Sequence, residues 1–162
     1  MRSLCATLLA TLGFALAGCG KKAPAVEADH AYTAHPHEHK APHGGTPVAL
    51  GNETYHLELV LDAGAGKLSA YVLDGEMENF VHSAAAAFEV IATVNGGQQI
   101  LVFKPVANAA TGEIVGDTSL FEAQAEWLKS TKEFDAMLTK FEVRGSSFSE
   151  VGFNFPKGND RD

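Results

Sequence analysis

The sequence predicts an all-β domain: an antiparallel β-sandwich of seven or eight strands, immunoglobulin-like or with similar Greek-key connections, and with at most one short helix. Three observations predict it. Short stretches between residues 46 and 156 alternate apolar and polar side chains with a period of two. Turn-forming glycine and asparagine residues separate these stretches. Helical character is confined to residues 122–138. The pattern is typical of a sandwich, or of a small barrel, of roughly 110 residues.

The clearest strand lies in the stretch TYHLELVLD, residues 54–62. One set of alternate side chains is apolar and is expected to face the core: Tyr55, Leu57, Leu59 and Leu61. The intervening set, to which His56 and Glu58 belong, is expected to face solvent. The turn AGAGK and the return strand LSAYVLD complete a β-hairpin over residues 54–74.

Further strands follow along the chain. They are predicted at residues 87–94, 98–106, 117–124, 139–145 and 147–155. Asn95-Gly96-Gly97 and Gly145 mark the turns of two more hairpins. The stretch 122–138 is expected to form either a short helix or an irregular crossover, with Trp127, Phe134 and Met137 closing one end of the core. A domain of this size buries enough surface to fold without a disulfide or a metal ion.

The N-terminus has the features of a secretory signal. Arg2 precedes an apolar run that is too short to span a membrane comfortably, so residues 1–18 are interpreted as a signal peptide. The run ends in Leu-Ala-Gly-Cys at residues 16–19, which resembles the lipobox of bacterial lipoproteins. This resemblance implies that Cys19 is acylated and becomes the mature N-terminus. Gly20, in place of Asp, implies sorting to the outer membrane. The domain is expected on the periplasmic face, and the cell exterior is the alternative. The alternative is a secreted protein with an incidental cysteine.

The number of cysteines and the net charge of the mature chain argue against several classes of function. Cys5 is removed with the signal and Cys19 is expected to carry lipid, so disulfides, cysteine-ligated metals and cysteine nucleophiles are not expected. The signal takes away one of the 12 basic residues and none of the 20 acidic ones, so the net charge falls from −8 to about −9. Such a balance argues against nucleic-acid binding and against electrostatic attachment to anionic lipid. Membrane attachment is therefore expected through the N-terminal lipid alone.

Residues 19–45 lack periodicity and large apolar side chains, which predicts a flexible tether. The β domain is expected to occupy residues 46–156, and residues 157–162 a disordered tail. Five of the seven histidines lie within DHAYTAHPHEHKAPHGG, residues 29–45. The motif HPHEH places His35, His37 and His39 on one side of an extended chain. We interpret these three as ligands of a divalent transition metal such as copper, zinc or nickel, with His43 and His30 as auxiliary ligands. The alternative is a solvated spacer.

The domain offers two further candidate sites. His56 and Glu58 share one strand face, where a metal-ligand pair competes with an ordinary exposed histidine. His82 and Met77 would suit copper, although Met77 is better suited to filling a gap in packing. We find no catalytic motif, so an enzyme is not expected.

The stretch PHGGTPVALGNETYHLELVLD, followed by AYVLDG, resembles a segment near the N-terminus of some periplasmic adaptors of heavy-metal efflux pumps. It is also similar to small uncharacterised bacterial lipoproteins of the same layout. The matching residues are His43, Gly44, Gly45, His56, Glu58 and Tyr71. The chain lacks the long coiled-coil hairpin of the adaptors and is too short for their lipoyl and barrel domains. The resemblance therefore implies an accessory module with a metal-related role.

Together these features predict a non-catalytic envelope lipoprotein that binds or buffers a transition-metal ion, as an accessory to metal efflux. The alternative is a protein-interaction or structural module in which the histidine-rich segment is only a spacer and an exposed edge strand recruits an envelope partner.

Overall fold

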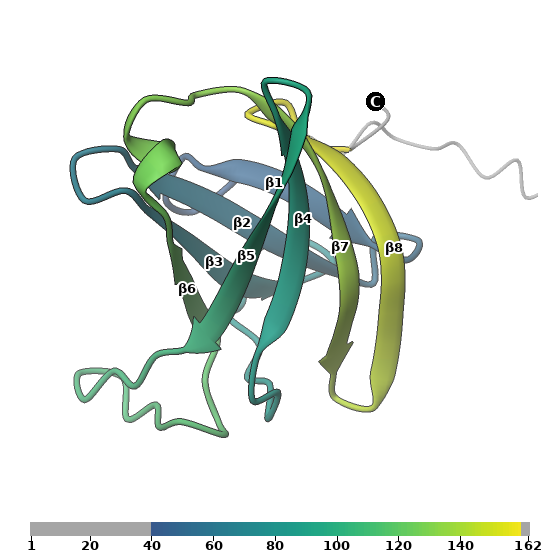
Figure 1. Ribbon diagram of the computed structural model, residues 1–162. Coiled ribbons are helices and arrows are strands. Elements are labelled where there is room, and N and C mark those ends of the chain that lie inside the picture. Colours follow the sequence, from purple (N-terminus) through teal and green to yellow (C-terminus); the bar gives the residue numbers. More distant parts are fainter. Residues whose placement is uncertain (1–39, 160–162) are drawn as a thin grey trace, which may run out of the picture. The chain divides into compact units, whose positions relative to one another are not determined.

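The alternating stretches form eight antiparallel strands in one continuous sheet (Figure 1). The structure is a computed structural model that describes residues 40–159. The strands are β1 (Thr46–Leu50), β2 (Tyr55–Asp62), β3 (Lys67–Asp74), β4 (Phe88–Val94), β5 (Gly97–Pro105), β6 (Leu120–Gln124), β7 (Phe134–Val143) and β8 (Ser146–Phe155). In this part of the chain the only helix is the single 3₁₀ turn η1 (Glu126–Lys129). The prediction of an antiparallel all-β fold with at most one short helix is confirmed.

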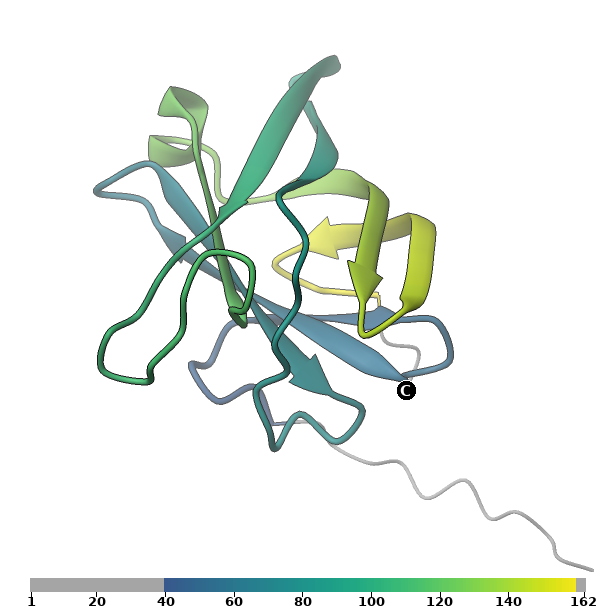
Figure 2. The same cartoon turned by 90° about the horizontal axis from the view of Figure 1, so that it is seen from below.

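The spatial order of the strands is β1-β2-β3-β6-β5-β4-β7-β8. Strands β4, β5 and β6 are consecutive neighbours, and β7 returns to lie beside β4, which is a Greek-key arrangement. Strand β5 joins the two halves of the sheet, because Gly97–Phe103 pairs with β4 whereas Lys104 and Pro105 pair with β6. Figure 2 shows the strands arranged around a common interior.

Aromatic side chains from four strands fill that interior. Phe88 on β4 has its ring centroid 4.7 Å from that of Phe103, 5.4 Å from Phe121 and 4.6 Å from Phe141. All four rings are at least 97% buried. Aromatic pairs in such offset and tilted arrangements stabilise a core beyond the area they bury. This cluster holds both halves of the sheet together.

The two ends of the sheet meet through the C-terminal segment. The side chain of Asn159 accepts a hydrogen bond from the Ala49 amide at 2.7 Å and donates one to the Ala49 carbonyl at 3.2 Å. Thr46 Oγ1 donates to the carbonyl of Pro156 at 3.1 Å. The free edge of β1 is therefore covered. The expected disordered tail is wrong for residues 157–159, and residues 160–162 lie outside the described part.

The stretch 122–138 contains the end of β6, the turn η1 and the start of β7. The turn η1 forms part of the crossover, and from Phe134 the chain is already strand β7. Phe134 is 3% exposed, but Met137 is 37% exposed and faces outward, contrary to the expectation that it closes the core. The reason is the period-two alternation of β7, which directs Phe134, Ala136 and Leu138 inward. No helix in residues 40–159 has the length and apolarity needed to cross a bilayer.

Candidate functional site

The motif His43-Gly44-Gly45 packs against the outer face of β2, where the side chain of Glu58 is fully buried. Oxygen Oε1 of Glu58 accepts the backbone N–H of His43 at 2.6 Å and that of Gly45 at 2.9 Å. The His43 ring donates from Nδ1 to Oε2 at 2.8 Å. Both carboxylate oxygens are thus satisfied, as a buried carboxylate requires. Residues 43–45 belong to the domain, so the predicted tether boundary at residue 45 lies too far along the chain.

Glycine is required at each of the two positions of the motif for a different steric reason. Gly44 has a φ of 67°, a left-handed conformation that glycine adopts without penalty. A Cβ on Gly45 would lie 2.6 Å from the Leu59 carbonyl oxygen and 2.8 Å from Glu58 Cγ. Only glycine allows the backbone to approach β2 this closely. The motif therefore holds His43 in one place on the domain.

The expectation that His56 and Glu58 face solvent is wrong, because both are 0% exposed. Alternation correctly placed them on the face of β2 opposite the core. On that face, however, residues 43–45 cover Glu58. His56 has its own polar neighbour, because its Nδ1 lies 3.3 Å from the carbonyl oxygen of Asp74. A polar strand face can be buried where its groups find polar partners.

His43 also belongs to an aromatic cluster. Its ring stacks on Tyr71 with centroids 3.9 Å apart and an interplanar angle of 17°. Phe80 tilts towards both rings, at 5.7 Å from His43 and 6.1 Å from Tyr71. Burial, together with the negative charges of Glu122 and Glu58, raises the pKa of the Tyr71 hydroxyl, which therefore remains neutral. Two separate contacts, Glu58 at Nδ1 and Tyr71 at the ring face, fix the orientation of the His43 imidazole.

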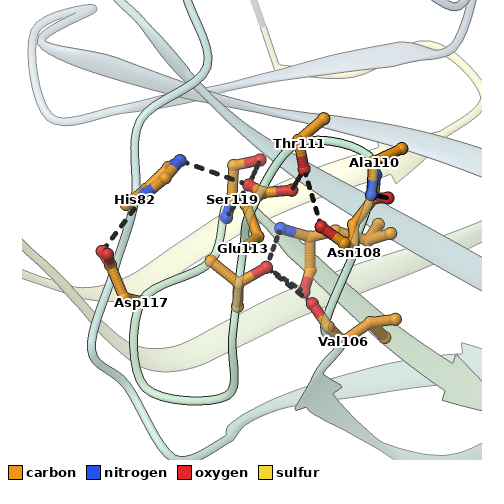
Figure 3. Close-up of polar contacts among 10 residues, drawn as sticks. His82, Val106, Asn108, Ala110, Thr111, Glu113, Asp117 and Ser119 are labelled. Atoms are coloured by element: carbon orange, nitrogen blue, oxygen red, sulfur yellow. Dashed lines mark hydrogen bonds and ion pairs between the residues drawn. The ribbon is translucent and has the colours of Figure 1, made fainter.

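His82 lies between two carboxylates (Figure 3). Its Nδ1 is 3.1 Å from Asp117 Oδ1, and its Nε2 is 3.4 Å from Glu113 Oε1. Both carboxylates come from the connection between β5 and β6. Both ring nitrogens can donate at once only when the imidazole carries its second proton.

Glu113 is itself a fixed, buried group, 6% exposed. Its Oε1 accepts the backbone N–H of Ser119 at 2.8 Å and also the Ser119 hydroxyl, and its Oε2 accepts the Thr111 hydroxyl at 2.7 Å (Figure 3). Burial alone would raise the pKa of Glu113, but these hydrogen bonds and the nearby His82 hold it below its usual value. The carboxylate is therefore ionised at neutral pH.

His43 and His82 line one cavity of about 220 Å³, which we call the His43–His82 cavity. Its wall is formed by His43, Tyr71, Phe80, His82, Asn108, Thr111, Glu113, Ser119 and Leu120. A larger open hollow of about 780 Å³ adjoins it and shares Phe80 and His82. The wall of the smaller cavity contains two imidazoles and a buried carboxylate but no lysine or arginine, a composition that suits a cation.

Other predicted site residues lie elsewhere. Cys19, His30, His35, His37 and His39 are outside the described residues. Met77 is 2% exposed and packs in the interior, as the packing alternative predicted. Within residues 40–159 no three His, Asp, Glu or Cys side chains already stand together closely enough to hold a metal ion.

Sequence reasoning missed Glu113 and Asp117. Glu113 directly precedes the turn Ile114–Asp117 and Asp117 ends it, in a connection without periodicity. The two residues follow His82 by 31 and 35 positions in the chain. The bridge between Ser83 and Thr118 brings the two segments side by side. The paired glycines Gly112 and Gly116 were the one local signal of a compact turn.

Comparison with protein-family models, curated proteins and solved structures gave no match for this chain.

Proposed function

We propose that the protein is a non-catalytic, lipid-anchored envelope protein that captures and buffers a divalent transition-metal ion, copper, zinc or nickel, as an accessory to metal efflux. The observation that carries this proposal is the state of His43. Its Nδ1 is bonded to the buried carboxylate of Glu58, and no described residue is bonded to its Nε2. Metal-binding histidines typically have one ring nitrogen held by a carboxylate, which orients the other nitrogen towards the metal.

The position of His43 in the chain supports the same proposal. Only three residues, Lys40, Ala41 and Pro42, separate it from His39. Four residues of extended chain span at most about 14 Å, so the chain length allows His39 and His43 to bind the same ion. His35, His37 and His39 would supply the first ligands and His43 the ligand fixed to the domain, with His30 as an auxiliary.

Anchoring follows from the lipobox-like segment. Acylation of Cys19 would keep the protein at the outer membrane, since stable attachment needs more than one acyl chain and lipoprotein cysteines normally carry several. The acidic composition, about −9 after removal of the signal, favours the approach of cations in general. Anchoring would concentrate the metal sites at the membrane surface.

Calorimetric titration of Cu(II) and Zn(II) into the unacylated mature chain, residues 21–162, tests the proposal. We expect micromolar or tighter binding, weakened at least tenfold when His35, His37 and His39 are all replaced by serine. Replacing the exposed carboxylate Glu126 by glutamine is the matched control and should change nothing. Absence of binding by the unsubstituted chain would refute a metal function.

A second candidate, a protein-interaction module, is favoured by an apolar row on the outer face of the sheet. Ile91 on β4 pairs with Ile100 on β5 and with Met137 on β7, and the last two are 62% and 37% exposed. The edge of β1 is bonded to Asn159, so this outer face is the better docking surface. Ile100→Lys would abolish capture of an envelope partner if this candidate is correct, and would leave metal binding unchanged.

A further inference from the structure

We infer that the His43–His82 cavity is a second metal site, within the folded domain, in which His82 Nε2, Glu113 and His43 Nε2 bind a divalent ion of the zinc or copper type. This inference rests on the proposed metal function and extends it, because it assigns a place in the domain to which the captured ion is transferred.

The first support is a repeated arrangement of the two imidazoles. His43 has its Nδ1 at 2.8 Å from Glu58 Oε2, and His82 has its Nδ1 at 3.1 Å from Asp117 Oδ1. In each case a carboxylate holds Nδ1, which leaves Nε2 as the coordinating nitrogen. Both rings line the same cavity. Two such histidines on one cavity wall match the carboxylate–histidine–metal pattern.

The second support is the distance between His82 Nε2 and Glu113 Oε1, which is 3.4 Å. That separation is long for a hydrogen bond between nitrogen and oxygen. It matches the spacing of two neighbouring ligands around a tetrahedral ion, which is about 3.4 Å for bonds of about 2.0–2.1 Å. An ion could therefore bind both atoms without a change in their separation.

The third support is the fixed carboxylate. Ser119 and Thr111 hold Glu113 by three hydrogen bonds, and the group is almost entirely buried. A ligand that is already ionised and immobile loses little entropy on binding an ion. Asn108, Thr111 and Ser119 add polar atoms to the cavity wall, where they can hold the water molecules that complete the coordination shell.

The third ligand, His43, has to come closer to His82 and Glu113 from the part of the cavity wall that it forms. Because no three ligands stand in place within residues 40–159, loading requires the turn that carries His43 to move closer to His82 and Glu113, which already have the spacing of neighbouring ligands. The side chain of His43 is 37% exposed, so the turn can move without disturbing the core. The donor set of two imidazoles and one carboxylate suits Zn(II), Cu(II) and Ni(II), and it contains no sulfur that would favour Cu(I).

His43 links the cavity site to the proposed capture of metal by the histidine-rich segment. It is the fixed ligand proposed for the histidine-rich segment, and it is also part of the cavity wall. An ion held by His35, His37, His39 and His43 could pass to His82 and Glu113 by successive ligand exchange, without ever leaving His43. The domain would then be the acceptor of the metal and the preceding segment its collector.

The test is a titration of Zn(II), and of Co(II) as a spectroscopic probe, into the complete mature chain carrying serine at positions 35, 37 and 39. We expect this protein to keep one bound ion per chain, with the intense visible absorption of tetrahedral Co(II). Addition of His82→Gln or Glu113→Gln should weaken that binding at least tenfold. Glu126→Gln, which changes an exposed carboxylate on η1, should leave the affinity unchanged.

The outcomes separate the two proposals. If the serine-substituted chain binds no ion while the unsubstituted chain does, the cavity site is refuted and the proposed function stands. If neither chain binds, both are refuted. Should Glu113→Gln unfold the connection between β5 and β6, His82→Gln decides, because its ring lies at the surface. Retention of full affinity and of tetrahedral Co(II) absorption by folded His82→Gln would overturn the inference.

Discussion

At the scale of single residues, His43 and Glu58 depend on each other. The carboxylate would be unsatisfied beneath the surface without the two backbone N–H groups and the ring nitrogen that it accepts. The imidazole in turn would be free to rotate without the carboxylate. A residue that stabilises the fold therefore also orients a candidate ligand, and the two roles can be separated by experiment.

Glu58→Gln tests the structural role. An amide keeps the shape of the side chain but loses the negative charge and one acceptor, so we expect the free energy of unfolding to fall by about 1.5–3 kcal/mol. Urea denaturation measures the change. The exposed residue Glu89 on β4 provides the control, since Glu89→Gln should alter stability by less than about 0.5 kcal/mol. Equal unfolding midpoints for Glu58→Gln and the unsubstituted protein would contradict the assigned role of Glu58.

The steric role of Gly45 gives a second prediction at this scale. A methyl group at this position would collide with the backbone of β2, so Gly45→Ala should destabilise the domain by roughly 1–3 kcal/mol. Gly97 is the matched glycine, because the nearest atom to its added Cβ is the Val94 oxygen at an ordinary 3.6 Å. Thermal unfolding should show a lowered Tm for Gly45→Ala only, and a similar Tm for both variants would rule out the close approach.

At the scale of elements, strand β2 and the connection between β5 and β6 differ in how far the sequence predicts them. The alternation in residues 54–62 predicts the strand and its inward side chains, since period two follows from backbone geometry alone. It does not predict that Glu58 is buried, because the covering turn at residues 43–45 lies in a segment without periodicity. Glu113 and Asp117 could not be predicted as partners of His82 either, because only the tertiary structure brings them close to it.

The connection between β5 and β6 should respond to acid through Glu113. The pKa of this carboxyl is lower in the folded protein than in the unfolded chain, so its ionised form stabilises the fold at pH values above the unfolded pKa of about 4.3. That contribution disappears as the pH falls through the folded pKa.

Urea unfolding of the unsubstituted protein and of Glu113→Gln at pH 7 and at pH 3 measures this effect. The difference in unfolding free energy between the two proteins should be larger at pH 7 than at pH 3. Asp74, whose pKa is also lowered, contributes equally to both proteins and cancels. A difference that is the same at both pH values would show that Glu113 does not stabilise the connection through its charge.

At the scale of the whole domain, the position of the cavity follows from strand order. Because β6 lies beside β3, the connection from β5 to β6 and the segment between β3 and β4 reach the same end of the sheet (Figure 1). The turn at residues 43–45 then covers the neighbouring part of β2 and β3. Three segments without periodicity thus supply the cavity wall, and a sheet with sequential strand order would separate them.

Closure of the sheet by Asn159 leads to the last prediction. Asn159→Ala removes two hydrogen bonds to Ala49 and exposes the N–H and C=O groups of β1, so we expect a loss of about 1–2 kcal/mol in the free energy of unfolding. An uncovered edge strand also pairs readily with another chain, so the variant should form dimers or larger species at high concentration. Lys157→Ala is the control in the same segment: it removes only an exposed ion pair with Glu133, and no measurable change is expected. Urea denaturation and size-exclusion chromatography measure the two effects. If Asn159→Ala retains both the stability and the monomeric elution of Lys157→Ala, the bonds to Ala49 do not protect β1.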